Sequence, residues 1–310
     1  MSRQTDTIDV IGVNGDFCRI SPPGYSWGPE LAPGSTGLFD MAIKTNWGDW
    51  GFGQFYQSWK PKRQDVVWTV NIVNPETNTL LDQDSDLWHT IVSRWKAMFS
   101  PAKEATIAYT SVDGERRRGL RTVQAPKSFS TNAFEGGDPH RFAAGSVVQT
   151  MACDFPYYVG KTESYAWEID EPGDYWFTLP FYNPSSMDIF VAWKLTGGVK
   201  WQLPDYSFGS EAYGRGLADI GKTIPLAALM NDEDLDIQTR PDLETFVTSL
   251  ETNFAGRNAG RDFEYPIPAG EGDSTSGCVV YAKVTNPAGA RCELQMPRWY
   301  DEPFSTPRIV

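Results

Sequence analysis

The sequence predicts a mainly β fold in two parts: an N-terminal β-sandwich with one α-helix at about 85–99, and a C-terminal jelly-roll β-sandwich. Aromatic residues, which favour strands, make up 14% of the chain, while 28 Gly and 22 Pro supply turns between strands. One stretch stands out as a helix by its apolar period. A length of 310 residues suits two domains. After residue 160 the density of acidic residues rises and short strand candidates alternate with turns, so we place the domains at 1–160 and 161–310.

The first half opens with a predicted hairpin, because Asn14-Gly15 joins two apolar runs and supplies the positive φ angles of a two-residue turn. A Gly- and Pro-rich loop is expected at 21–37, with strands at 38–44 and 64–73. The segment 45–59 is too glycine-rich for a helix and too aromatic for a solvated linker, so we expect a bent edge strand or a docking loop. Its candidate subunit-interface residues are Trp47, Trp50, Phe52 and Phe55.

A helix is predicted at 85–99, where apolar side chains recur at the spacing of one helical face. Asp84 or Ser85 can cap its start, and Pro101 stops it. A stripe of this kind usually faces a core, and we assign it there. It consists of Leu87, Trp88, Ile91, Val92, Trp95, Met98 and Phe99.

A second hairpin is predicted around Asp113-Gly114, with arms at 105–112 and 115–123. Its outgoing strand carries four arginines, which either cover a solvated face or meet an acidic surface on a neighbouring subunit. A further strand at 144–155 ends in the cluster DFPYYVG (154–160). The candidate interface arginines are Arg116, Arg117, Arg118 and Arg121.

After residue 160, short strand candidates alternate with Asn-Pro, Gly-Gly and Pro-Ala-Gly turns, a layout typical of a β-sandwich or jelly roll. Aromatic positions in these strands either present a sugar-stacking platform or form core and cross-strand pairs, and the core interpretation is favoured. The candidate stacking residues are Trp193 and Trp201. The expected strands lie at 163–169, 174–182, 187–195, 199–203, 222–230, 234–239, 244–252, 261–267, 277–285 and 290–296.

Charge is unevenly distributed along the chain, whose formal net charge is −13. Residues 1–160 hold 15 Lys and Arg against 17 Asp and Glu, whereas residues 161–310 hold 12 against 23. Neither half offers the cationic face that sequence-independent nucleic-acid binding requires. The N-terminus has no apolar signal-peptide region and no run approaches a membrane span, so we expect synthesis in a cytoplasm and no membrane insertion.

The sequence offers few groups for metal or catalytic chemistry. Its two histidines, His89 and His140, are expected in solvent and no zinc-binding spacing occurs, so neither a metal nor a cofactor is predicted. GDSTSG (272–277) lacks the second Gly of a nucleophile elbow, and the acidic run 232–236 lacks the Gly and Glu that complete a calcium loop. We therefore predict that the chain is not an enzyme. A glycan hydrolase remains an alternative, because the chain has 40 acidic residues and their separation in space is not given by the sequence.

The order of these elements resembles the N-terminal domain of siphophage distal tail proteins, the Dit-like minor tail proteins. The strand end ACDFPYYVG (152–160) looks like the family's Asp-Pro-aromatic cluster with one residue inserted. The second half looks like the galectin-like or carbohydrate-module-like sandwich of many such proteins. It does so through FYNPSSMDIFVAWKLTGGVKWQLPD (181–205), LDIQTRPD (235–242) and FEYPIPAGEGD (263–273). The inserted Phe155 and the long aromatic segment 45–59 depart from the family pattern.

The resemblance implies a structural component of a bacteriophage tail tip, made in the bacterial host cytoplasm and located in the virion tail. It implies a homo-hexameric ring that joins the tail tube to the tip or baseplate complex. The implied partners are the tail tube protein, the tail-tip hub or tail-associated protein, the tape measure, and receptor-binding or fibre proteins. The alternative is a carbohydrate-binding protein that recognises host surface glycans through its C-terminal domain.

Overall fold

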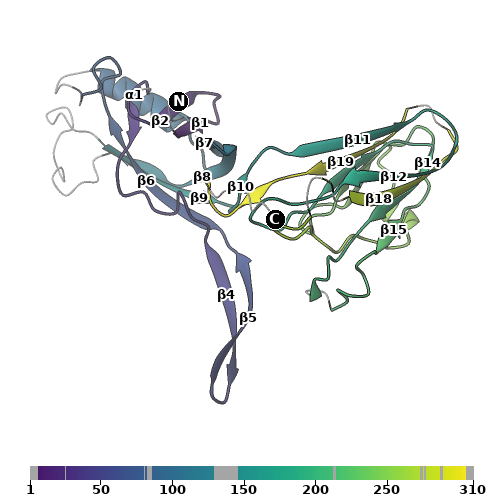
Figure 1. The fold of residues 1–310 in the computed structure, drawn as a ribbon. Helices are drawn as coiled ribbons and strands as arrows, with labels where there is room; N and C mark the ends of the chain where they lie inside the picture. The colour runs from purple at the N-terminus through teal and green to yellow at the C-terminus, as the bar shows by residue number, and fades with distance from the viewer. Residues whose placement is uncertain are drawn as a thin grey trace. The chain divides into compact units, whose positions relative to one another are not determined.

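The computed structural model describes residues 6–24, 26–79, 81, 86–128, 146–211, 214–272, 275, 277–286 and 289–304. The chain separates into two compact units, both drawn in Figure 1. Unit 1 comprises Met1–Gly160 and Tyr300–Ser305, and unit 2 comprises Lys161–Trp299 and Thr306–Val310. The described elements are mainly strands, so the predicted β fold class is confirmed.

Unit 1 is built on an antiparallel sheet in the order β2-β1-β7-β8-β9-β6-β3. The long strand β8 (Gly114–Ser128) pairs with β7 through its first half and with β9 through its second half, so it joins two half-sheets around one core. The short strand β10 pairs with β8 through Val159 and Arg117. The other strands are β1 (Thr7–Ile11), β2 (Phe17–Ser21), β3 (Pro29–Leu31), β6 (Gln64–Ile72), β7 (Ala105–Ser111), β9 (Ser146–Cys153), β10 (Tyr158–Val159) and β20 (Trp299–Tyr300).

The helix α1 (Asp86–Ala97) closes the core of unit 1, as its apolar period predicts, except that Leu87 of the predicted stripe is 37% exposed in the first turn. Trp95 is fully buried, with its ring centroid 6.5 Å from that of Trp68 on β6 and 4.9 Å from that of Phe99. Basic residues in the last turn suit the negative end of the helix dipole. The predicted capping residues, Asp84 and Ser85, lie outside the described residues.

Both predicted hairpins of unit 1 form, and Gly15 and Gly114 have φ angles of +84° and +102°. The first loop is longer than the predicted two-residue turn, because the last pair of its ladder is Ile11 with Phe17. The strand expected at 38–44 is wrong, because residues 38–40 form bends, residues 41–42 have no regular structure and the strand begins at Ile43. Side chains explain the difference. Arg118 donates to the carbonyls of Gly37 and Asp40, which therefore bond outside a strand ladder.

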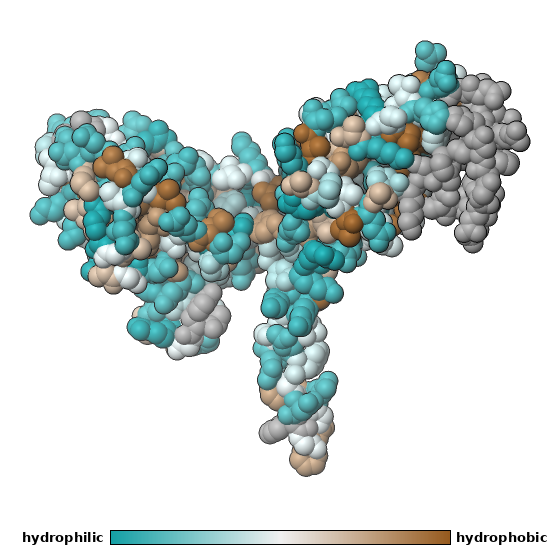
Figure 2. Space-filling model, turned by 180° about the vertical axis from the view of Figure 1, so that it is seen from behind, coloured by the Kyte–Doolittle hydropathy of each residue, from teal (hydrophilic) through white to brown (hydrophobic). Residues whose placement is uncertain are grey.

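Two strands of unit 1, β4 (Ile43–Trp50) and β5 (Gly53–Pro61), pair only with each other among the described residues. We call this hairpin, residues 43–61, the arm. The arm projects from the rest of unit 1 in Figure 1, and Figure 2 shows it from behind as a narrow column. No residue of β5 is buried.

Unit 2 consists of two antiparallel sheets, one in the order β11-β19-β13-β16-β17 and the other β12-β18-β14-β15. Burial alternates along β18 and β19, so each sheet turns one face to the core and the other to solvent. The strands are β11 (Glu163–Ile169), β12 (Gly173–Pro180), β13 (Ala192–Leu195), β14 (Val199–Pro204), β15 (Thr223–Pro225), β16 (Leu235–Gln238), β17 (Phe246–Thr248), β18 (Gly277–Val284) and β19 (Ala290–Met296).

The predicted strand at 261–267 is wrong, since only Ile267 forms a bridge, to Ile189. The physical reason is that the backbone N–H groups of Glu264 and Tyr265 donate to the buried carboxylate of Asp205 rather than to a neighbouring strand. A short helix, α2 (Phe254–Arg257), precedes this segment and is capped by the side chain of Asn253.

Candidate functional site

One face of the arm carries a cluster of exposed aromatic side chains. Trp47 pairs across the hairpin with Tyr56, and Thr45 pairs with Trp59, so these four side chains share a face. The rings of Trp47 and Tyr56 meet edge to face, with centroids 5.7 Å apart. The three aromatic residues are 54%, 50% and 45% exposed in the order Trp47, Tyr56, Trp59. The arm therefore presents apolar surface that nothing described in this chain covers.

On the opposite face of the arm, the position of the Phe55 ring requires a glycine at residue 48. Gly48 pairs with Phe55, and a Cβ atom at Gly48 would lie 2.6 Å from the Phe55 ring, so the ring lies across the strand where a side chain would stand. Phe52 is fully exposed in the turn, and Phe55 is 47% exposed. Trp50 is the last residue of β4, and its side chain lies outside the described set. The segment expected as an edge strand or docking loop is thus a complete hairpin.

Two of the four candidate interface arginines are internal, which corrects the interface assignment for Arg116 and Arg118. Both are 2% exposed, because they share with Leu120 the face of β8 that points inward. The guanidinium of Arg116 stacks 3.6 Å from the centre of the Tyr300 ring and donates to the carbonyl of Glu302. These contacts hold residues 300–302 against β8 within unit 1.

Arg118 fastens the root of the arm. It donates to the carbonyls of Gly37 (3.2 Å), Asp40 (3.1 Å) and Pro156 (2.8 Å), and it lies 4.0 Å from the centre of the Tyr158 ring. The Tyr158 hydroxyl in turn donates to the Leu38 carbonyl, and burial raises the pKa of this tyrosine to about 12. The cluster at 154–160 therefore holds the chain just before β4.

The remaining arginines lie nearer the surface. Arg117 is exposed and pairs with Glu115 at 2.5 Å, so it is the one arginine of the four with an open outward position. Arg121 is partly exposed and contacts Asp154, Glu104 and the carbonyl of Ala102. Exposed pairs of this kind contribute little to stability.

The candidate stacking residues Trp193 and Trp201 are fully buried, so neither ring can stack on a sugar. This corrects their assignment as a platform and agrees with the core interpretation. Strand parity carries the signal: Trp193 shares its parity with Leu195 while Lys194 points out. The same rule, applied to β12, puts Trp176 on the solvent side, and this residue is 67% exposed. Sequence reasoning missed it.

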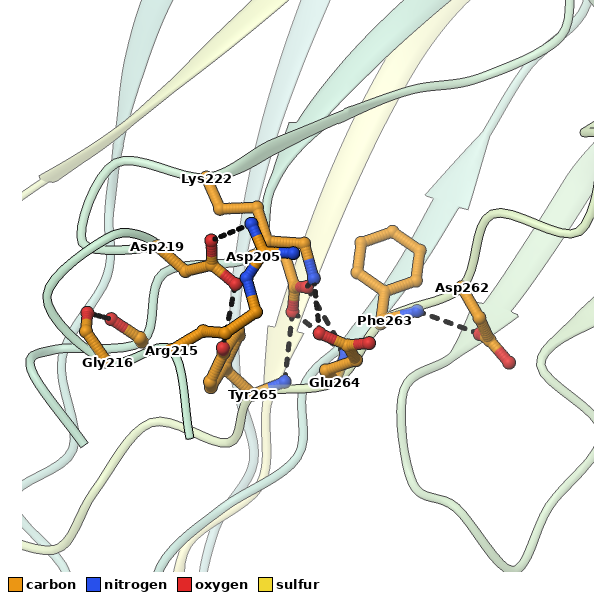
Figure 3. Close-up of polar contacts among 10 residues, drawn as sticks. Asp205, Arg215, Gly216, Asp219, Lys222, Asp262, Phe263, Glu264 and Tyr265 are labelled. Atoms are coloured by element: carbon orange, nitrogen blue, oxygen red, sulfur yellow. Dashed lines mark hydrogen bonds and ion pairs between the residues drawn. The ribbon is translucent and has the colours of Figure 1, made fainter. Parts of the chain in front are cut away.

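A polar cleft of about 390 Å³ lies beside β15 in unit 2, and Figure 3 shows its polar network. The buried carboxylate of Asp205 accepts from Lys222 at 2.8 Å and from two backbone N–H groups. Asp219 accepts from the Tyr265 hydroxyl at 2.8 Å and from Arg215 at 3.2 Å. Each buried carboxylate thus has several donors.

Lys222 and Arg215 of this cleft form ion pairs with carboxylates of the same unit. Burial works to lower the pKa of Lys222, but the carboxylates of Asp205 and Glu264 more than offset it, and the net shift is upward. Lys222 lies 2.6 Å from Glu264, and Arg261 donates to the Pro225 carbonyl. We interpret the network as one that holds loop 205–222 against residues 263–265.

Only some of the candidate metal and catalytic residues lie within the described ranges. His89 is exposed on α1, and the predicted acids Asp232, Asp234 and Asp236 all point outward. His140 and Ser274 lie outside the described residues. Within the described ranges, no three His, Cys, Asp or Glu side chains are grouped so that they could hold a metal ion. No described helix has the length and apolarity needed to cross a membrane.

The fold of nearly the whole chain is similar to that of the phage SPP1 Dit protein, described as a paradigm of hub adsorption apparatus in phages that infect Gram-positive bacteria. The two align with a TM-score of 0.55 and 10% identity over 96% of this chain and 99% of that chain. A chain of the phage P2 baseplate, in its activated conformation with Ca, aligns with a TM-score of 0.47 and 9% identity over 95% and 98%. No known family model and no curated protein sequence matches.

Proposed function

We propose that this chain is a structural protein of a bacteriophage tail tip, where copies of it form a homo-hexameric ring. The observation that carries the proposal is the likeness of fold to the SPP1 Dit protein, which extends over 96% of this chain and 99% of that one. The likeness extends over residues of both units, so it concerns more than one common sandwich. The galectin-like character of unit 2 stays a prediction.

The arm supports the ring, because its aromatic face suits a contact with a second copy of the chain. An isolated two-stranded hairpin is marginally stable in water, so strands of eight and nine residues with three exposed aromatic side chains favour a covering partner. Aromatic residues are enriched in interface cores. An arm on each copy that reaches the next copy is a head-to-tail contact, and such contacts form a ring when the rotation between neighbouring copies closes.

The root of the arm supports the same role. Arg118 and Tyr158 bind backbone carbonyls at residues 37–40 and leave the hairpin free beyond them. A contact made by the arm would therefore be coupled to the core sheet of unit 1.

In the proposed assembly the ring joins the tail tube to the tip or baseplate complex. Its partners are the tail tube protein, the tail-tip hub or tail-associated protein, the tape measure, and receptor-binding or fibre proteins. The near-neutral first half of the chain suits self-association, and the excess of acids in the second half suits a solvated surface. The protein works as a scaffold in the virion tail, after synthesis in the host cytoplasm, and we propose no catalytic step for it.

The test compares the mass of the full chain with that of an arm-deleted variant, in which segment 45–59 is replaced by a short Gly-Ser turn between the paired residues Lys44 and Lys60. We expect the wild type at about 208 kDa by light scattering, six times the chain mass of 34.7 kDa, and the variant at the mass of one chain. Val112→Ser is the matched control, because Val112 is an exposed apolar residue at another hairpin of unit 1. A wild type that stays monomeric, or an arm-deleted variant that stays hexameric, would contradict the proposal.

A further inference from the structure

The outer face of the four-stranded sheet of unit 2 carries a row of side chains that crosses all four strands. In register, Trp176 on β12 pairs with Tyr281 on β18, Tyr281 pairs with Gln202 on β14, and Gln202 pairs with Pro225 on β15. None of the four is buried, whereas their chain neighbours Phe177, Val280, Leu203 and Ile224 are. With strands about 4.8 Å apart, the row is about 14 Å long.

An aromatic pair forms one end of the row. Trp176 is 67% exposed, and its ring centroid lies 4.6 Å from that of Tyr281 at an interplanar angle of 40°. The Tyr281 hydroxyl donates to Asp174 at 2.8 Å, which fixes the tyrosine ring. Because the exposed Trp176 ring packs against this fixed tyrosine ring, Trp176 can bind a ligand at a lower cost in side-chain entropy.

Polar groups flank the aromatic row on both sides. On one side Asp174 pairs with Lys283, and Lys283 pairs with Lys200, so a carboxylate and two ammonium groups lie in line. On the other side stand the hydroxyls of Thr178 and Thr223, and Gln202 donates to Thr223 at 2.5 Å. The row, which includes the amide of Gln202, is thus bordered by charged groups on one side and by two hydroxyls with the exposed Val279 between them on the other.

We propose that this sheet face binds a glycan, with an uncharged pyranose ring stacked on Trp176 and further sugar units laid along the row toward β15. The C–H groups on one face of a pyranose ring carry partial positive charge and match the negative face of an indole. The hydroxyls at the ring's edge then meet the polar groups on either side. A row that crosses four strands fits an oligosaccharide better than a single sugar.

A protein or nucleic-acid ligand fits this face less well. A stable protein interface takes about 800 Å² from each partner, and charged residues are depleted in its core, whereas here Asp174, Lys200 and Lys283 border the rings directly. Nucleic acid needs a cationic surface, and residues 161–310 hold 12 basic against 23 acidic residues.

The test measures the binding of chitohexaose, cellohexaose and maltohexaose to the full chain, with saturation-transfer NMR as the readout. We expect at least one probe to bind, and Trp176→Ala to weaken that binding about tenfold or more. Trp176→Phe and Gln202→Ala should weaken it less, and thermal unfolding checks that each variant is folded. Leu217→Ala is the matched control, since it shortens a 76% exposed apolar side chain of unit 2 that lies outside both the row and the arm.

Three results would overturn the proposal. The first is that none of the three hexasaccharides binds at about 10 mM, and the second is that Trp176→Ala binds them as the wild type does. The third is that the chain binds only dextran sulfate, tested as a polyanionic sugar, and loses it at high salt, because that would show charge attraction rather than ring stacking. The proposal is independent of the ring. Trp176→Ala should keep the wild-type mass, and the arm-deleted variant should keep the wild-type affinity for the probe, so the two proposals can fail separately.

Discussion

At the scale of single residues, strand parity decides which side chains serve the core and which are open to partners. The four arginines of β8 form one basic run in the sequence, yet Arg116 and Arg118 point inward and Arg117 points outward. The inward pair was hard to predict because buried arginines are rare, and their partners are backbone carbonyls far along the chain. Trp176 was predictable, since Phe177 and Leu179 mark the opposite, buried parity of its strand.

Arg118 carries the first prediction at this scale. Arg118→Leu should lower the free energy of unfolding of unit 1 by about 3 kcal/mol, because it leaves buried carbonyls of three residues without their charged donor. Urea denaturation measures this change, with hydrogen exchange of the α1 backbone amides as the probe that reports on unit 1. Arg117→Leu is the control, and as an exposed change it should stay within about 0.5 kcal/mol of the wild type. Equal effects of the two substitutions would contradict the internal role of Arg118.

At the scale of elements, the sequence predicted those with a local signal and missed those set by long-range contacts. The apolar period of α1 and the turns at Gly15 and Gly114 are local, and all three are confirmed. The start of β4 depends instead on Arg118 binding the carbonyls at 37–40 from another strand. The expected strand at 261–267 failed for a similar reason, because Asp205 takes its N–H groups.

One buried carboxylate links several elements of unit 2 and gives the stability of that unit a predictable dependence on pH. Glu233 is fully buried and accepts from Arg257 of α2 at 2.5 Å, from the Thr252 hydroxyl at 2.6 Å and from the Met230 N–H at 3.1 Å. Burial alone would raise the pKa of this carboxyl group. The three donors more than offset burial and lower the pKa below its ordinary value of 4.5.

Because the folded-state pKa of Glu233 is depressed, its contribution is complete above pH 4.5 and is lost as the pH falls through the folded pKa. We expect Glu233→Gln to destabilise unit 2 at pH 7 by about 3 kcal/mol and to lose less stability than the wild type below pH 4.5. Urea denaturation across pH 7 to 3 measures both effects. Asp232→Asn, at the exposed neighbour, should follow the wild-type curve, and an identical curve for Glu233→Gln would refute the assignment.

At the scale of the whole molecule, the order of elements indicated the fold more strongly than any motif did. The hairpins, the aromatic segment, the helix and the run of short strands appear in the predicted order, and the fold they form is similar to that of the SPP1 Dit protein at 10% identity. A likeness at 10% identity concerns the fold and not individual contact residues. The arm and the face around Trp176 therefore rest on the burial, register and hydrogen bonds of this chain.

Electron microscopy of the purified wild-type chain tests the central claim most directly. Class averages should show closed particles with six-fold symmetry, with the arm of each copy seated on its neighbour and its aromatic face covered. The arm-deleted variant on the same grids should show single chains only. Wild-type averages that show single chains at high protein concentration, or rings in which the arms point into solvent, would contradict the account.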